Sequence, residues 1–152
     1  MKFPPALVAA TLFFAMPLQA AEGLKVNDPW IQAAPPVSQT QAGYLTIENP
    51  GAKEITIVGA ESPGFAKIEM HETMMHDGKS MMHPRDRLSV APGGQLKLAP
   101  GGLHLMLIAP QKPLQPKERV PVTLKLGDGG KLTFEAEVRA GGSGGHEQHM
   151  HH

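Results

Sequence analysis

Turn residues cut most of this chain into short segments, and this division restricts its fold more than any other feature. Of the 152 residues, 17 are glycine and 15 are proline, and the interior of a helix tolerates both poorly. The segments between the turns alternate apolar and polar residues, as in "AGYLTIEN" at 42–49. Such alternation is typical of strands with one buried face. No segment has a convincing helical period, so we expect an all-β domain.

Eight or nine short strands are expected. Asp77-Gly78 predicts a hairpin turn within the loop that follows the fourth strand, and the final two strands flank the turn 127–130 and should form a closing hairpin. Strands of this length and spacing predict a two-sheet β-sandwich or a Greek-key barrel. The expected strands lie at 24–31 (with a break near Asp28-Pro29), 42–49, 54–60, 66–72, 87–90, 95–98, 103–109, 119–126 and 131–138.

Both ends of the chain differ in composition from the expected β domain. Residues 1–20 have the layout of a secretory signal peptide, with Lys2 before a short apolar run at 6–16 and small residues at the end. The run is shorter than the roughly 20 residues that a membrane-spanning helix needs. We expect cleavage after Ala20 or Ala21, a soluble periplasmic protein with a domain at 22–140, and a flexible tail at 141–152 that begins with "GGSGG".

Charge and cysteine content exclude several function classes. Lys plus Arg and Asp plus Glu both number 14, with no basic cluster, so we expect no binding to nucleic acid or to an anionic membrane surface. The chain has no cysteine, which excludes a cysteine nucleophile, thiol redox chemistry and a His-Cys blue-copper site. Any metal must therefore be held by histidine, methionine or oxygen donors.

Histidine and methionine are concentrated in a few places. Beyond the first 20 residues, every one of them lies in the segment 70–83, in the strand 103–107 or in the tail. Methionine that merely filled a core would be scattered over many strands. This clustering indicates that the two residue types serve a shared purpose.

The strand pattern places several of these side chains together. In "LHLML", His104 and Met106 share one face of a strand while the leucines take the other. His71 projects from the end of another strand, away from the core face, and the following loop returns through Met81 and Met82. Two imidazoles and two thioethers thus form a candidate metal site, in which either of the neighbouring methionines could take part.

This donor set favours one kind of ion. Thioether sulfur is a soft donor that suits Cu(I), whereas Zn²⁺ prefers thiolate, imidazole or carboxylate. Calcium and magnesium need oxygen donors. A thioether also has no proton to lose, so acid weakens its binding less than that of a thiolate. The exported, cysteine-free chain therefore indicates binding of Cu(I) outside the cytoplasm.

The spacing His71-x10-Met82-x21-His104-x-Met106 resembles the H-x10-M-x21-H-x-M motif of the PCuAC family of periplasmic copper chaperones. The segments "WIQAAPP", "AGYLTIEN" and "PGGLHLML" are also similar to those of the family, and the resemblance covers about 24–139. It implies a cupredoxin-like Greek-key β-sandwich that binds one Cu(I) through these four residues. It also implies delivery of copper to the CuA centre of cytochrome c oxidase subunit II, alongside a thioredoxin-like Sco assembly protein. We expect a monomer that is not an enzyme.

Some interpretations stay open. A passive copper buffer and a copper redox enzyme are the alternative functions. Met74, Met75, His76 and His83 are either accessory ligands or a solvated loop tip. The tail is either a plain disordered end or a looser site that captures Cu(II), which suits imidazole donors. Its candidate ligands are His146, His149, Met150, His151 and His152.

Overall fold

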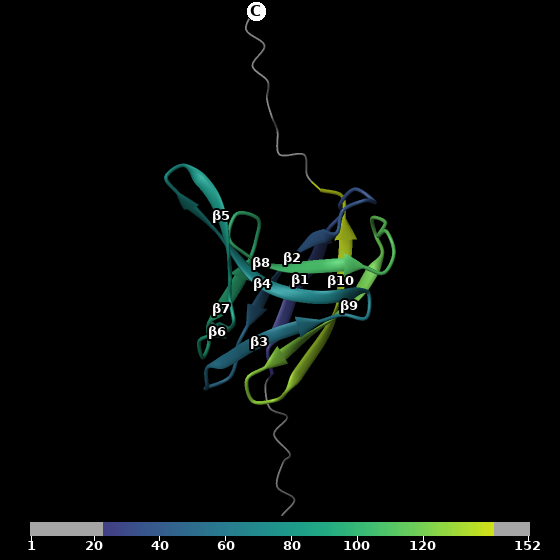
Figure 1. The fold of residues 1–152 in the computed structure, drawn as a ribbon. Helices are drawn as coiled ribbons and strands as arrows, with labels where there is room; N and C mark the ends of the chain where they lie inside the picture. The colour runs from purple at the N-terminus through teal and green to yellow at the C-terminus, as the bar shows by residue number, and fades with distance from the viewer. Residues whose placement is uncertain (1–22, 142–152) are drawn as a thin grey trace, which may run out of the picture.

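A computed structural model describes residues 23–141, and within that range the chain forms ten strands and no α-helix (Figure 1). Every expected strand is present, so the all-β prediction is confirmed. The strands are β1 (Lys25–Gln32), β2 (Thr40–Glu48), β3 (Ile55–Glu61), β4 (Phe65–His76), β5 (Lys79–Pro84), β6 (Leu88–Val90), β7 (Gln95–Leu98), β8 (Leu103–Pro110), β9 (Arg119–Leu126) and β10 (Lys131–Arg139). Among these described residues, no helix is long and apolar enough to cross a bilayer.

The expected break near Asp28-Pro29 is an irregularity within one strand. β1 continues through it, but its register with β2 shifts between Asn27 and Trp30. Asp28 takes a positive φ of 46°, a conformation that aspartate adopts more readily than most residues. Beyond this irregularity, β1 pairs with β2 on one side and, in parallel, with β10 on the other.

The sheet closes on itself. Its strand order is β5-β4-β8-β2-β1-β10-β9-β3-β6, and an additional pairing of Ala60 with Ile68 joins β3 back to β4. The result is a barrel-like sandwich in which most neighbouring strands are distant in sequence (Figure 1). This agrees with the predicted Greek-key β-sandwich.

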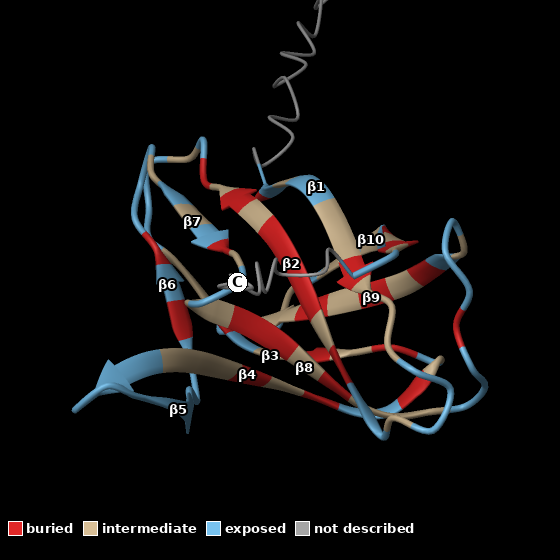
Figure 2. Ribbon diagram, turned by 90° about the horizontal axis from the view of Figure 1, so that it is seen from above, coloured by how far each residue is buried: buried red, intermediate tan, exposed pale blue. Residues whose placement is uncertain are grey.

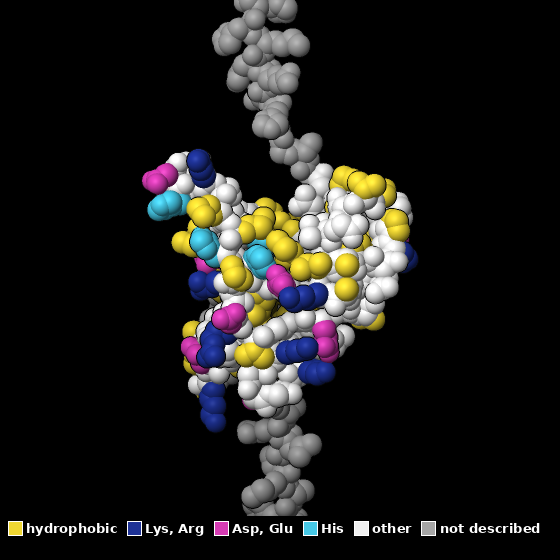
Figure 3. All heavy atoms as spheres, viewed as in Figure 1, with side chains coloured by type: hydrophobic (Ala, Val, Ile, Leu, Met, Phe, Trp, Pro, Cys, Tyr) yellow, Lys and Arg dark blue, Asp and Glu magenta, His cyan; other side chains and the backbone are white. Residues whose placement is uncertain are grey.

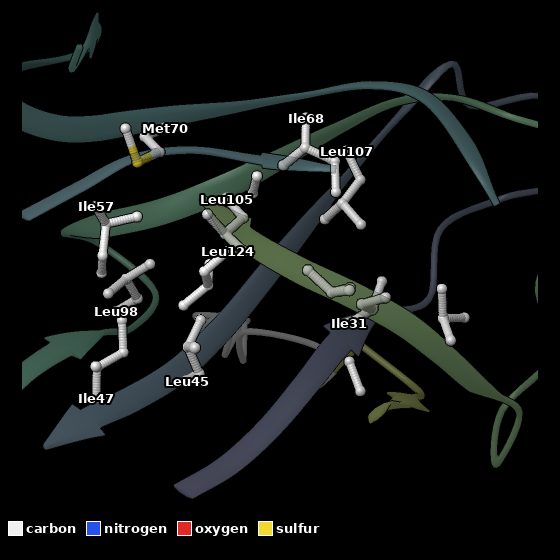
Figure 4. Packing of buried hydrophobic residues seen from close by; sticks show 14 of the residues in the cluster. Ile31, Leu45, Ile47, Ile57, Ile68, Met70, Leu98, Leu105, Leu107 and Leu124 are labelled. Atoms are coloured by element: carbon white, nitrogen blue, oxygen red, sulfur yellow. The ribbon is translucent and has the colours of Figure 1, made fainter. Parts of the chain in front are cut away.

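Alternate residues of the strands fill the interior. Buried and less buried positions follow in turn along β9 (Figure 2). Figure 4 shows inward side chains packed together, among them Leu105, Leu107 and Leu124. Leu107 and Leu124 are each only 1% exposed. The three leucines of "LHLML" therefore occupy the face that the alternation predicted, which leaves His104 and Met106 on the other.

The β4–β5 hairpin projects from this body. The first part of β4 pairs with β8 as far as Glu72, whereas the part from Thr73 to His76 pairs only with β5. Every residue of β5 is exposed, and Figure 1 shows the hairpin standing away from the rest of the sheet. The expectation of a loop after 72 is wrong here: the chain forms a two-stranded ribbon around the predicted turn at Asp77-Gly78.

Candidate metal centre

The four predicted donors lie on one face of three adjacent strands. His71 of β4 pairs directly with His104 of β8. On β8, Met106 is two residues from His104 and therefore on the same face. Met82 of β5 pairs with Thr73, which is two residues from His71 on β4. The strand register thus brings together side chains that are up to 35 positions apart in the sequence.

The same register separates Met82 from Met81. Met81 pairs with Met74, so these two side chains point to the opposite face of the ribbon. Strand alternation alone allowed either methionine, whereas the motif spacing assigned Met82. Met82 is the one that shares a face with the two imidazoles.

The two imidazoles are close enough to hold one ion. Their ring centroids are 5.9 Å apart, with an angle of 37° between the ring planes. Metal–nitrogen bonds of about 2 Å place an imidazole centroid roughly 3 Å from the ion. Two such rings around a single ion would therefore have centroids no more than about 6 Å apart, so the observed separation of His71 and His104 fits.

A backbone carbonyl orients His104. The side chain is buried, with 5% exposed, and its Nδ1 donates a hydrogen bond of 3.1 Å to the carbonyl oxygen of Gly102. A carbonyl can only accept, so Nδ1 carries the proton. In the neutral ring Nε2 then keeps its lone pair, which is the form of imidazole that binds a metal.

A carboxylate orients His71 in the corresponding way. Its Nε2 donates to Oε2 of Glu69 at 2.8 Å, and hydrogen bonds from Lys67 and then from His71 hold the pKa of Glu69 below its usual value. Glu69 is therefore ionised and can only accept. The other ring nitrogen, Nδ1, is buried without a hydrogen-bond partner in the protein. A buried lone pair with no partner is costly, and a bound metal ion would satisfy it.

The four donors do not all line the same pocket. Met82, His104 and Met106 line one open pocket of about 280 Å³, together with residues 32–35 and 40–42. His71 lines a different hollow, with Glu69 and residues 84–86. His71 thus lies beside His104 but lines a different hollow. Met82, His104 and Met106 face one common pocket.

Glu69, which pairs with Met106 and bonds to His71, is the carboxylate beside these donors in the described residues. Between residues 23 and 141, no group of three or more His, Cys, Asp or Glu side chains could hold a metal ion. The described part of the chain therefore offers no site rich in hard oxygen ligands. The set that does come together consists of two imidazole nitrogens with two thioether sulfurs.

Other predicted residues lie elsewhere. The tail candidates His146, His149, Met150, His151 and His152 and the expected signal peptide at 1–20 are outside the described residues. Met74, Met75, His76 and His83 are exposed on the projecting hairpin. Figure 3 shows histidine and hydrophobic side chains distributed along this hairpin.

Sequence reasoning missed Glu69. The signal was present in "KIEMHE", because a carboxylate two residues before a candidate ligand shares its strand face. In metal sites, a group that accepts a hydrogen bond from the ligand's other nitrogen fixes the ring and its tautomer.

Comparisons with known proteins place the chain in a family. A family described as "Putative lipoprotein LpqE-like" matches residues 24–138. The chain belongs to the LpqE-like family. A relative described as putative lipoprotein Lxx21020, from Leifsonia xyli subsp. xyli, is 31% identical over 124 residues, which are 81% of this chain and 74% of the relative. Both the family and this relative are thus described as putative lipoproteins.

Solved structures share this fold, among them a PCuAC domain, which confirms the fold that the resemblance to the PCuAC family implied. The copper-bound PCuAC domain from PmoF2 is 23% identical, covers 78% of this chain and 93% of its own, and has a TM-score of 0.65. Apo-DR1885 from Deinococcus radiodurans is 30% identical with a TM-score of 0.62, and covers 93% of both chains. The Cu(I) form of DR1885 is 29% identical with a TM-score of 0.57, and covers 79% of this chain and 78% of its own.

The hydrogen bond from His71 to Glu69 can be tested without metal. In the apoprotein, NMR should detect the Nε2-bound proton of His71, because the carboxylate slows its exchange with water. Glu69→Ala should lose this signal and bind Cu(I) about tenfold more weakly, as loss of a ligand's hydrogen-bond partner typically does. Glu72→Ala is the matched control, since Glu72 pairs with Arg85 instead. A His71 ring protonated at Nδ1 would contradict the assignment.

Proposed function

We propose that the protein is a periplasmic copper chaperone that binds one Cu(I) ion through His71, Met82, His104 and Met106. One observation carries this proposal. Two opposed imidazoles, each with one nitrogen held as a donor and the other left free, share a face with two thioethers. All four donors are neutral when they bind, so the ion keeps its single positive charge and no proton has to be released from a thiol.

Cu(I) is the ion that this set suits best. Thioethers are soft donors that select Cu(I) over Zn²⁺, Ca²⁺ and Mg²⁺. A similar protein supports this choice, because DR1885 has been solved in a Cu(I) form and is 29% identical to this chain.

Unequal burial of the donors supports delivery of the ion by ligand exchange. His104 is buried, whereas Met82 is 57% exposed at the edge of the projecting ribbon. An incoming acceptor ligand could replace the exposed thioether first, while the imidazoles still hold the ion. The acceptor that we propose is the CuA centre of cytochrome c oxidase subunit II, with a Sco-like protein acting alongside.

The contribution of sulfur can be measured with two matched substitutions. Met106→Leu removes a thioether from the donor face, whereas Met70→Leu removes one from the core of the adjacent strand, where Met70 is 5% exposed. We expect Met106→Leu to lower the Cu(I) affinity at least about tenfold, a loss of about 1.4 kcal/mol in binding free energy, and Met70→Leu to change it little. Competition with a chromogenic Cu(I) chelator measures both.

Two histidine variants extend this comparison. His104→Ala should also weaken Cu(I) binding by more than about tenfold, and His76→Ala should do so less. Equal losses of Cu(I) affinity in Met106→Leu and Met70→Leu, or in the two histidine variants, would contradict the proposed ligand set.

Transfer distinguishes a chaperone from a buffer. The Cu(I)-loaded protein is mixed with an apo CuA domain, and the visible absorption of the acceptor is followed under conditions that allow the centre to oxidise. We expect the CuA spectrum to appear. A passive buffer would retain its copper, and a redox enzyme would instead consume oxygen in the presence of a reductant.

For the tail, we propose a separate and looser capture of Cu(II) by His146, His149, Met150, His151 and His152. The reason is compositional, because imidazole-rich sites suit Cu(II). Deletion of 141–152 should lower the Cu(II) affinity and leave Cu(I) binding at the core site intact. An unchanged Cu(II) affinity would rule out this role.

A further inference from the structure

The β4–β5 ribbon carries a second group of soft donors on the face turned away from the candidate centre. Met74 and Met81 form a direct cross-strand pair. His76 lies two residues beyond Met74 on β4, and His83 lies two residues beyond Met81 on β5, so both histidines share the face of this methionine pair. Glu72, opposite His83, and Lys79, opposite His76, also lie on this face. We call it the outer face of the hairpin, and its soft donors are Met74, His76, Met81 and His83.

The outer face is accessible to an ion. Met74 is 49% exposed and Met81 is 46% exposed, and from Thr73 onward β4 has no strand pairing other than with β5. The side chain of His76 is 76% exposed and approaches Asp77 at 3.4 Å. A methionine pair held only for packing would be expected against the core, as Met70 is, and not half exposed on a ribbon.

Strand geometry allows both sulfurs to reach one ion. Directly opposed residues of an antiparallel pair have Cβ atoms about 5 Å apart, and diagonal neighbours are about 7–8 Å apart. Methionine has three rotatable side-chain bonds and adapts to many positions. His83 is diagonal to Met74, and His76 is diagonal to Met81. An imidazole is therefore available on either side of the thioether pair.

We propose that the outer face is a second Cu(I) site, with Met74 and Met81 as its sulfur ligands and His83 or His76 as the nitrogen ligand. It is separate from the His71–His104 centre, because Met81 and Met82 are sequence neighbours that point to opposite faces of the same ribbon. Its more exposed donors give it the weaker affinity. The two faces of the ribbon would then each contribute methionine to a Cu(I) site, and the site on the outer face would be the more exposed to solvent.

Methyl NMR resolves each methionine and tests the site in the full chain. With 13C-methyl methionine, anaerobic titration with Cu(I) should shift the Met82 and Met106 signals first. The Met74 and Met81 signals should then shift together at higher Cu(I). In this second phase Met75, which is 70% exposed and lies on the same face as Met82, should move little. The tail methionine, Met150, gives a separate signal, so copper bound there does not confuse the result.

Matched variants complete the test. Met74→Leu with Met81→Leu should abolish the later phase, and Met75→Leu should leave it unchanged. In His104→Ala, the response of Met74 and Met81 should persist although the first phase is weakened, so failure of the main centre can be told apart from failure of this one. The proposal is overturned if Met74 and Met81 move no more than Met75 in the second phase, or if their response disappears in His104→Ala.

Discussion

The pairing of β4 with β8 is the constraint on which the rest of this structure depends. In this register Met70 pairs with Leu105 and Ile68 pairs with Leu107, all on the core side. The same register sets His71 against His104 on the other side. A slip of one residue would exchange the two faces of a strand, placing an imidazole in the core and a leucine at the metal centre. Burial of apolar side chains therefore fixes the geometry of the donors.

The fold divides the candidate centre into a rigid part and an accessible part. His104 and His71 belong to strands of the closed barrel-like sandwich, and each is oriented by an acceptor for its protonated nitrogen. Met82 belongs to a ribbon with solvent on both faces. A centre with this division can hold an ion firmly at its imidazoles and still offer an exposed thioether for exchange. The face opposite Met82 repeats the same donor chemistry with Met74 and Met81.

Local patterns predicted much of this structure, and long-range pairing supplied the rest. Alternation of residues gave the strands and the shared face of His104 and Met106, because the period of two is a property of the single strand. The motif spacing assigned Met82 rather than Met81, but the face on which Met82 lies depends on how β5 pairs with β4. The closure of the sheet depends on one pairing, between Ala60 and Ile68. The sequence does not decide whether β4 continues past Glu72, because the methionines and histidines that follow fit a strand and a loop equally. Glu69 looked like an ordinary surface carboxylate until its bond to His71 was visible.

X-ray absorption at the copper edge tests the central claim most directly. The protein loaded with one equivalent of Cu(I) should show both nitrogen and sulfur neighbours around the ion, and the sulfur contribution should fall in Met106→Leu but not in Met70→Leu. A first coordination shell of nitrogen and oxygen alone would contradict a centre built from two imidazoles and two thioethers.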